Sequence, residues 1–130
     1  LLRSSVLLLY RVLWRYVRNH YGIEIPRSTV IGRRFRIAHQ SGIVLHPHGR
    51  IGDDCIIRQN VTIGAVTWER FQDGPQIGHR VDIGAGAVIL GKVTIGDGAK
   101  IGPNTVITTN VPAGATVFVE APRMIQMKKC

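Results

Sequence analysis

The stretch "IGHRVDIGAGAVILGKVTIGDGAKIGPNTVI", residues 77–107, carries an isoleucine at every sixth position. A helix repeats about every 3.6 residues and a strand about every two, so neither element alone produces this spacing. A period of six fits a solenoid in which each unit is a short strand followed by a corner. Three such units would close one triangular coil, with the isoleucines pointing inward.

The triangular coil predicts which residues stack on one another. Three units of six residues place each isoleucine against the isoleucine of the next coil. A smaller residue recurs four places after each aliphatic residue and should fill the remaining interior, while glycine often follows the aliphatic directly and should permit a tight corner. The pairs expected to stack are Ile77 with Ile95, Ile83 with Ile101, and Ile89 with Ile107.

The same period extends toward both ends of the chain. It begins at Ile25, slips by two residues near residues 43–45, breaks at the stretch "AVTWERFQDGPQ", and resumes at Ile77. The expected fold is all-β, a parallel β-helix preceded by a short N-terminal α-helix. Its expected parts are the β-helix over residues 23–118, with a protruding loop at 65–76, and a C-terminal tail at 119–130.

Residues 1–22 are expected to form the N-terminal helix, which is amphipathic. Leu2, Val6, Leu9 and Leu13 fall on one stripe, and arginines occupy much of the rest. The uninterrupted apolar run is too short to cross a bilayer. Two interpretations stay open: packing on the domain or a partner subunit, and peripheral contact of residues 1–18 with an anionic membrane surface.

Composition restricts the class of protein. The chain has 130 residues, enough for one domain, and a formal charge of +9 from 17 Lys+Arg against 8 Asp+Glu. Such a charge attracts polyanions, but no zinc-finger spacing or RNP motif accompanies it, so nucleic-acid binding is not expected. The two cysteines make no disulfide framework, which favours a cytoplasmic protein.

Four stretches within the repeat carry a more specific pattern: "IAHQSGIVL" (37–45), "IIRQNVTIG" (56–64), "IGAGAVILGKVTIGDGAKIG" (83–102) and "NVPAGATVF" (110–118). They resemble the serine acetyltransferase branch of the hexapeptide-repeat acetyltransferases and its relatives in polysaccharide gene clusters. The resemblance implies a left-handed β-helix, since periodicity alone gives no handedness. It also implies a homotrimer that uses acetyl-CoA and no metal.

The resemblance places a general base at His39, because the family has its catalytic histidine at this position of a "DHATGIV"-like stretch. Imidazole suits the task because its unperturbed pKa lies near neutrality. The family orients this histidine with an aspartate fifteen residues upstream, where this chain has Glu24. Glu24 is therefore the expected orienting residue, with a solvated carboxylate as the alternative.

Two departures from the family concern the acceptor. Ala38 replaces an aspartate that contacts the amino-acid acceptor, and Gly74 replaces a second active-site histidine. Loss of these polar contacts weakens the case for free serine. The expected reaction is therefore direct acetyl transfer to a hydroxyl of a sugar or glycan precursor, with serine O-acetylation as the alternative.

The protruding loop and a nearby histidine supply candidate acceptor contacts. Trp68 could stack on a sugar face, and Arg70 could bind a phosphate or carboxylate. His46 could line the same site. For the loop, the alternative is contact with a neighbouring subunit. For His46, the alternative is an outward-facing pair with His48.

The resemblance also implies where acetyl-CoA lies, in a groove between two prisms where small residues allow close approach. Corner geometry alone is the alternative explanation for these small residues. Basic residues near the C-terminus are candidates for the nucleotide phosphates. The expected contacts are Gly64, Ala65, Gly84, Ala85 and Pro103 for the arm, and Arg123, Lys128 and Lys129 for the phosphates.

Two other classes remain as alternatives to an acetyltransferase. A γ-type carbonic anhydrase uses the same prism but needs three zinc-binding histidines, and the family's closely spaced downstream pair is missing here. A non-enzymatic scaffold would keep the prism without binding CoA.

Overall fold

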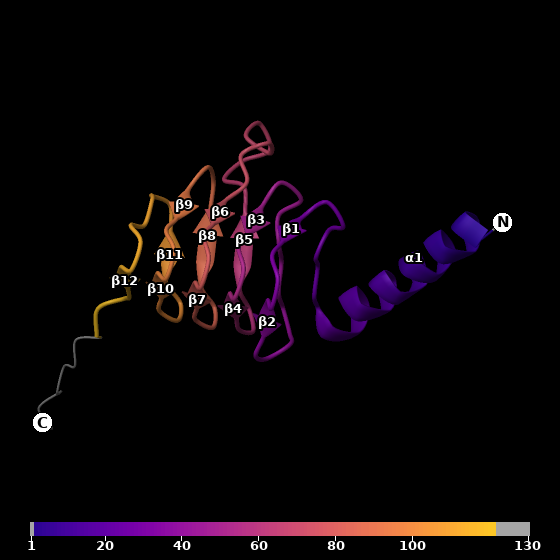
Figure 1. Cartoon of the computed structure of the whole chain (residues 1–130), viewed down its shortest axis with the longest axis horizontal. Coiled ribbons are helices and arrows are strands. Elements are labelled where there is room, and N and C mark those ends of the chain that lie inside the picture. The colour runs from indigo at the N-terminus through magenta and orange to yellow at the C-terminus, as the bar shows by residue number, and fades with distance from the viewer. Residues whose placement is uncertain (1, 122–130) are drawn as a thin grey trace, which may run out of the picture.

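A computed structural model of the chain describes residues 2–121. Helix α1 (Leu2–Tyr21) precedes a solenoid of short strands, and one loop stands out from the solenoid near β5 and β6 (Figure 1). The strands are β1 (Val30–Ile31), β2 (Arg36–Ile37), β3 (Arg50–Ile51), β4 (Ile56–Ile57), β5 (Thr62–Gly64), β6 (Gln76–Ile77), β7 (Asp82–Ile83), β8 (Val88–Leu90), β9 (Thr94–Ile95), β10 (Lys100–Ile101), β11 (Val106–Ile107) and β12 (Thr116–Val117).

The strands form three parallel sheets, which are the three sides of a prism. Side I has the order β1-β3-β6-β9, side II β2-β4-β7-β10-β12, and side III β5-β8-β11. Isolated bridges extend side III to Val44 and Glu24. Along the chain, each coil runs from side III to side I and then to side II. The edges are named here by the sides they join: III/I, I/II and II/III.

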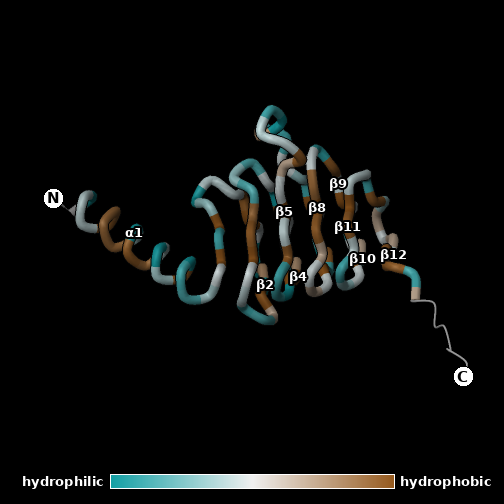
Figure 2. Tube along the Cα trace, turned by 180° about the vertical axis from the view of Figure 1, so that it is seen from behind, coloured by the Kyte–Doolittle hydropathy of each residue, from teal (hydrophilic) through white to brown (hydrophobic). Residues whose placement is uncertain are grey.

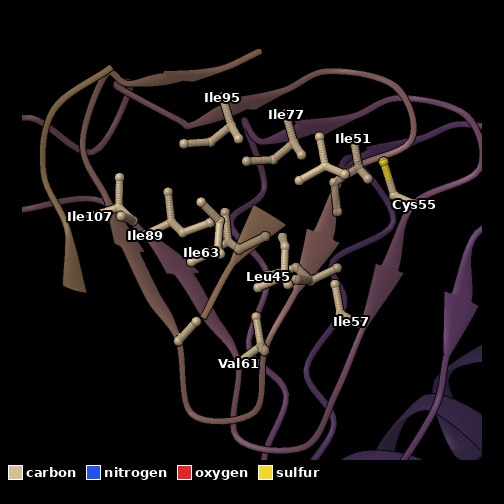
Figure 3. Close-up of a cluster of buried hydrophobic side chains, with 14 of the residues drawn as sticks. Leu45, Ile51, Cys55, Ile57, Val61, Ile63, Ile77, Ile89, Ile95 and Ile107 are labelled. Atoms are coloured by element: carbon tan, nitrogen blue, oxygen red, sulfur yellow. The ribbon is translucent and has the colours of Figure 1, made fainter. Parts of the chain in front are cut away.

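The register confirms the predicted stacking. Ile77 pairs with Ile95 on side I, Ile83 with Ile101 on side II, and Ile89 with Ile107 on side III. In the core, Ile77 and Ile95 lie in one row and Ile89 and Ile107 in another (Figure 3). The small residues fill the gaps between rows; Cys55 is fully buried, and its thiol donates to the Gly78 carbonyl at 3.1 Å.

The glycines that directly follow the aliphatic residues have a different role from the one expected. A Cβ at Gly52 would lie 2.5 Å from the Gly78 oxygen, and one at Gly84 would lie 2.5 Å from the Pro103 nitrogen. Neither has a positive φ. They allow neighbouring coils to approach closely, and the left-handed turn residue comes two places later. Those turn residues are Arg34, Asp54, Arg80, Gly86, Gly98 and Asn104.

Helix α1 meets the prism only near its C-terminal end, and its N-terminal end points away from the prism (Figure 1). The Trp14 indole N–H donates to the Ile25 carbonyl at 3.3 Å, and the Gly42 N–H donates to the Tyr21 carbonyl at 3.1 Å. Apolar residues recur along α1 and along the strands, whereas hydrophilic residues gather at the turns (Figure 2). Within residues 2–121, no helix has both the length and the apolar character needed to cross a membrane.

Candidate active site

The II/III edge brings together the expected base and three expected acetyl-CoA contacts. His39 follows β2, Gly84 and Ala85 follow β7, and Pro103 follows β10, so all four lie where side II turns into side III. Backbone bonds link the successive corners of this edge, including Asn104 N–H to the Ala85 carbonyl at 2.9 Å. The His39 side chain is exposed. The coils therefore align these residues along one edge of the prism.

A hollow runs beside this edge and joins small residues to basic ones. The floor of this hollow is made of residues without large side chains, which are Gly84, Ala85, Gly102 and Pro103. Arg58 and Lys100, which were not among the expected contacts, also line it. Lys100 is exposed, and Arg58 is ion-paired with Asp82. The hollow is lined by Arg58, Asp82, Gly84, Ala85, Lys100, Ile101, Gly102, Pro103 and Thr116.

The expected contact between Glu24 and His39 is not formed. Within residues 2–121 no hydrogen bond joins the two side chains; a carboxylate oxygen of Glu24 lies 3.6 Å from Nε of Arg18 instead. The reason is that α1 ends directly above the first coil and brings an arginine to the start of side III. Both residues still lie close to the II/III edge, since Glu24 bridges Val44 just after the corner that contains His39.

The remaining candidate residues lie at a different edge, III/I. Gly64 and Ala65 end β5 and begin the protruding loop, and His46 lies in the corresponding corner of the preceding coil. Gly74 closes the base of the loop against that corner. A Cβ at Gly74 would collide with the His48 carbonyl. The position where the family has a histidine therefore accepts only glycine in this loop conformation.

An aromatic hollow of about 250 Å³ opens at the III/I edge. Phe71 lies over His46 with ring centroids 4.8 Å apart, and Trp68 stacks on Phe71 at 5.6 Å. Trp68 is 85% exposed. Arg70 pairs with Asp73 at 2.9 Å, which already neutralises the guanidinium that was expected to bind an acceptor. The lining residues are His46, Ala65, Val66, Thr67, Trp68 and Phe71.

His46 is buried at 5% exposure, which corrects the alternative of an outward-facing histidine pair. Its Nδ1 accepts the His48 backbone N–H at 3.2 Å, so the neutral ring carries its proton on Nε2. That Nε2 is buried without a partner among the described residues. Burial, and secondarily the charge of His48, lower the pKa of His46.

Acidification should therefore destabilise the chain through His46. A lowered folded pKa means that the unfolded chain takes up the proton first as the pH falls below about 6.5. The stabilisation that neutral His46 gives to the folded chain is complete above that pH and is lost as the pH falls below it. Urea unfolding at pH 7.5 and 5.5 should show a smaller acid-induced loss for His46→Gln than for the unaltered chain. Equal losses in both proteins would contradict this.

The structure thus divides the candidate residues between two edges and does not bring them together in one copy. His39, Gly84, Ala85 and Pro103 lie at II/III, whereas Gly64, Ala65, His46 and Trp68 lie at III/I. Arg123, Lys128 and Lys129 lie outside the described residues. Within residues 2–121 no group of three or more His, Cys, Asp or Glu side chains could hold a metal ion.

Comparison with known proteins identifies homologues. Residues 74–109 match the family described as bacterial transferase hexapeptide (six repeats). The chain is 40% identical over 117 residues to a serine acetyltransferase of Staphylococcus xylosus, covering 90% of the chain and 54% of that relative. It is 40% identical over 106 residues to a serine acetyltransferase of Helicobacter pylori, covering 82% of the chain and 62% of that relative.

Solved structures agree with these relatives. The serine acetyltransferase isoform 3 of Entamoeba histolytica, in complex with cysteine, matches with a TM-score of 0.82 at 39% identity, over 91% of the chain and 42% of that protein. The soybean serine acetyltransferase apoenzyme matches with a TM-score of 0.79 at 32% identity, over 95% and 51%. The chain spans 54% and 62% of the length of the two curated relatives. These relatives favour serine over the expected sugar acceptor, and they do not support the expected link to polysaccharide gene clusters.

Proposed function

We propose that the chain is an acetyl-CoA-dependent O-acetyltransferase that acts by direct transfer. The observation that carries this proposal is the II/III edge, where an exposed imidazole shares one line of corners with a hollow that has a floor of small residues and the exposed Lys100 at its side, while Arg58 is held by Asp82. Small residues suit an extended pantetheine arm, and basic side chains suit its phosphates. The serine acetyltransferase relatives support the same chemistry.

His39 would act as the general base. It would take the proton of the acceptor hydroxyl while that oxygen attacks the thioester carbonyl carbon, and the tetrahedral intermediate would then collapse with release of the CoA thiol. Backbone N–H groups near Gly64 or Ala65 would stabilise the oxyanion. Glu24 would orient His39 only after releasing Arg18, since the two charges are paired in the isolated chain.

The division of the candidate residues between two edges supports a homotrimer. A three-fold heterologous interface joins one edge of each copy to a different edge of its neighbour. The II/III edge of one copy would then face the III/I edge of the next, so that His39 meets the Ala65 edge across the boundary. The left hand of the coil is part of the same proposal and rests on the resemblance to the family.

Serine is the first acceptor to test, because the relatives are serine acetyltransferases. A sugar hydroxyl is the second candidate, and three observations favour it. Ala38 offers no charge to an amino group, Gly74 has no room for a side chain, and the aromatic hollow presents the exposed Trp68 ring.

A panel of acceptors separates these candidates. CoA release from acetyl-CoA should be followed with serine, nucleotide sugars and free sugars, and the acetylated product identified by mass spectrometry. Acceptor-dependent CoA release with any hydroxyl compound supports the proposed reaction, and the acceptor with the highest kcat/KM identifies the substrate class. Failure of CoA to bind the folded chain by calorimetry would instead favour a scaffold.

Ala38→Asp should improve the use of serine. An exposed carboxylate next to His39 would supply the ionic partner that the amino group of serine lacks, and hydrogen bonds to charged groups change affinity by roughly tenfold or more. The measurement is kcat/KM for serine, with Ala113→Asp as the control, because Ala113 is exposed at the I/II edge, which is not part of the proposed site. An equal gain in both variants would mean that added negative charge, rather than its position, is responsible.

A further inference from the structure

Helix α1 exposes an apolar surface that the prism does not cover. Among its described side chains, ten apolar ones are between 36% and 64% exposed, although none belongs to the core of the prism. A soluble monomer rarely leaves so large a contiguous apolar surface open, and such surfaces mark interaction sites. The exposed residues are Val6, Leu7, Leu8, Leu9, Tyr10, Val12, Leu13, Tyr16, Val17 and Tyr21.

Three arginines of α1 lie on the side opposite Leu9 and Leu13, and Leu8 lies beside them. Arg11, Arg15 and Arg18 succeed one another at spacings of four and three residues, which places them along one strip of the helix. Arg18 is held by Glu24 and lies over the Trp14 ring at 5.2 Å. Arg11 and Arg15 have no acidic partner within residues 2–121, and helix α1 itself contains no Asp or Glu.

Charge decides which partner fits this surface. A second copy of α1 would complement only the apolar side, because it would add four more arginines and no carboxylate to pair with Arg11 and Arg15. An anionic lipid surface offers both complements at once: acyl chains for the apolar side and phosphates for the arginines. A helix seated at the boundary between headgroups and acyl chains keeps its opposite side at the level of the phosphates.

The attachment of α1 leaves room for this contact. The start of the prism is bound by Arg18, which belongs to the arginine strip, and by Trp14, which lies beside that strip. Leu9 and Leu13, at the centre of the apolar side, are 57% and 53% exposed, and the helix leads away from the solenoid (Figure 1). The helix could therefore lie flat on a membrane while the prism stays in water.

From these observations we propose that α1 binds the surface of anionic membranes, with Leu9 and Leu13 in the acyl region and Arg11 and Arg15 at the phosphates. The partner class is a bilayer rich in anionic phospholipid. This proposal is independent of the acetyltransferase activity, because none of the four residues lies at the II/III or III/I edge.

The test is co-sedimentation of the full chain with vesicles of phosphatidylcholine alone or mixed with phosphatidylglycerol. The chain should bind the mixed vesicles, bind them less at high salt, and bind phosphatidylcholine weakly. Arg11→Ala with Arg15→Ala should lower the partition coefficient roughly thirtyfold. Leu9→Gln with Leu13→Gln should lower it by more than about tenfold; glutamine preserves the helix, which circular dichroism can check.

The control variant removes the same charge from the prism: Arg50→Ala with Lys92→Ala, both exposed. It should bind the mixed vesicles almost as well as the unaltered chain. An equal loss in the control, equal binding to both kinds of vesicle, or no vesicle binding at all would each overturn the proposal. If the chain does not bind the vesicles, its mass should be measured by light scattering. A lower mass for Leu9→Gln with Leu13→Gln than for the unaltered chain would then mean that the apolar surface joins copies of the chain.

Discussion

Replacing His39 by alanine should lower kcat/KM for acetyl transfer by about 10²- to 10⁴-fold, the range that a general base contributes. The imidazole is exposed at the II/III edge, so its loss removes the proton acceptor without opening a cavity in the core. Circular dichroism and the Tm should therefore stay unchanged. CoA release in the presence of the best acceptor is the measurement.

His79→Ala is the matched control for this substitution. His79 is another exposed histidine, but it lies at the I/II edge, where its Nδ1 accepts the Asp53 N–H at 2.9 Å. Its removal should leave turnover close to that of the unaltered chain. Full activity of His39→Ala would refute the assigned base, and an equal loss in His79→Ala would point to a general effect on the prism.

Ile89→Ala should produce the largest loss of stability. Ile89 is fully buried and lies in the middle of the row formed by side III, between Ile63 and Ile107 (Figure 3). Truncating a buried isoleucine costs about 2–5 kcal/mol, because the rigid coils on either side cannot collapse into the cavity. In a solenoid both neighbouring interfaces lose contacts at once. For a domain of this size the Tm should fall by roughly 8–20 °C.

Val30→Ala supplies the comparison for that prediction. Val30 points outward on β1 and is 48% exposed, so the same kind of truncation should change the free energy of unfolding by about 0.5 kcal/mol or less. Chemical unfolding of both variants distinguishes the two positions. Similar losses at Ile89 and Val30 would mean that the interior row does not hold the coils together.

The sequence predicts the prism well, because a single rule governs it. The period of six fixes which residues point inward, and the isoleucine pairs stack as the period requires. The same rule could have located a polar ladder that was missed at the I/II edge. Asp53, His79 and Asp97 each follow an Ile-Gly pair, and two hydrogen bonds link them from coil to coil: Asp53 N–H to His79, and His79 N–H to Asp97.

Side-chain partners at the candidate site follow no such rule. The salt bridge between Glu24 and Arg18 depends on how α1 sits above the first coil, which no periodicity encodes. The burial of His46 depends on Phe71, which a loop of irregular geometry folds back over it. The pairing of Arg70 with Asp73 is the exception, since residues three apart in a tight turn are natural partners. Local spacing therefore reveals some contacts, and tertiary placement decides the others.

The central claim is that one active site is built from the II/III edge of one copy and the III/I edge of its neighbour. It predicts that two differently inactivated chains can repair each other. His39→Ala removes the base from the first edge. Ala65→Trp blocks the second edge, where Ala65 is part of the aromatic hollow and a large side chain can project into it without disturbing the core.

The decisive measurement is acetyl transfer by mixtures of these two variants, unfolded together in urea and refolded so that their copies exchange. Over all the trimers formed from an equal mixture, about a quarter of the boundaries join an intact His39 edge to an intact Ala65 edge, so activity should return to about a quarter of that of the unaltered chain. Each variant refolded alone should stay inactive. If the mixture also stays inactive while forming trimers, both edges serve a site within one chain, and the shared-site account is wrong.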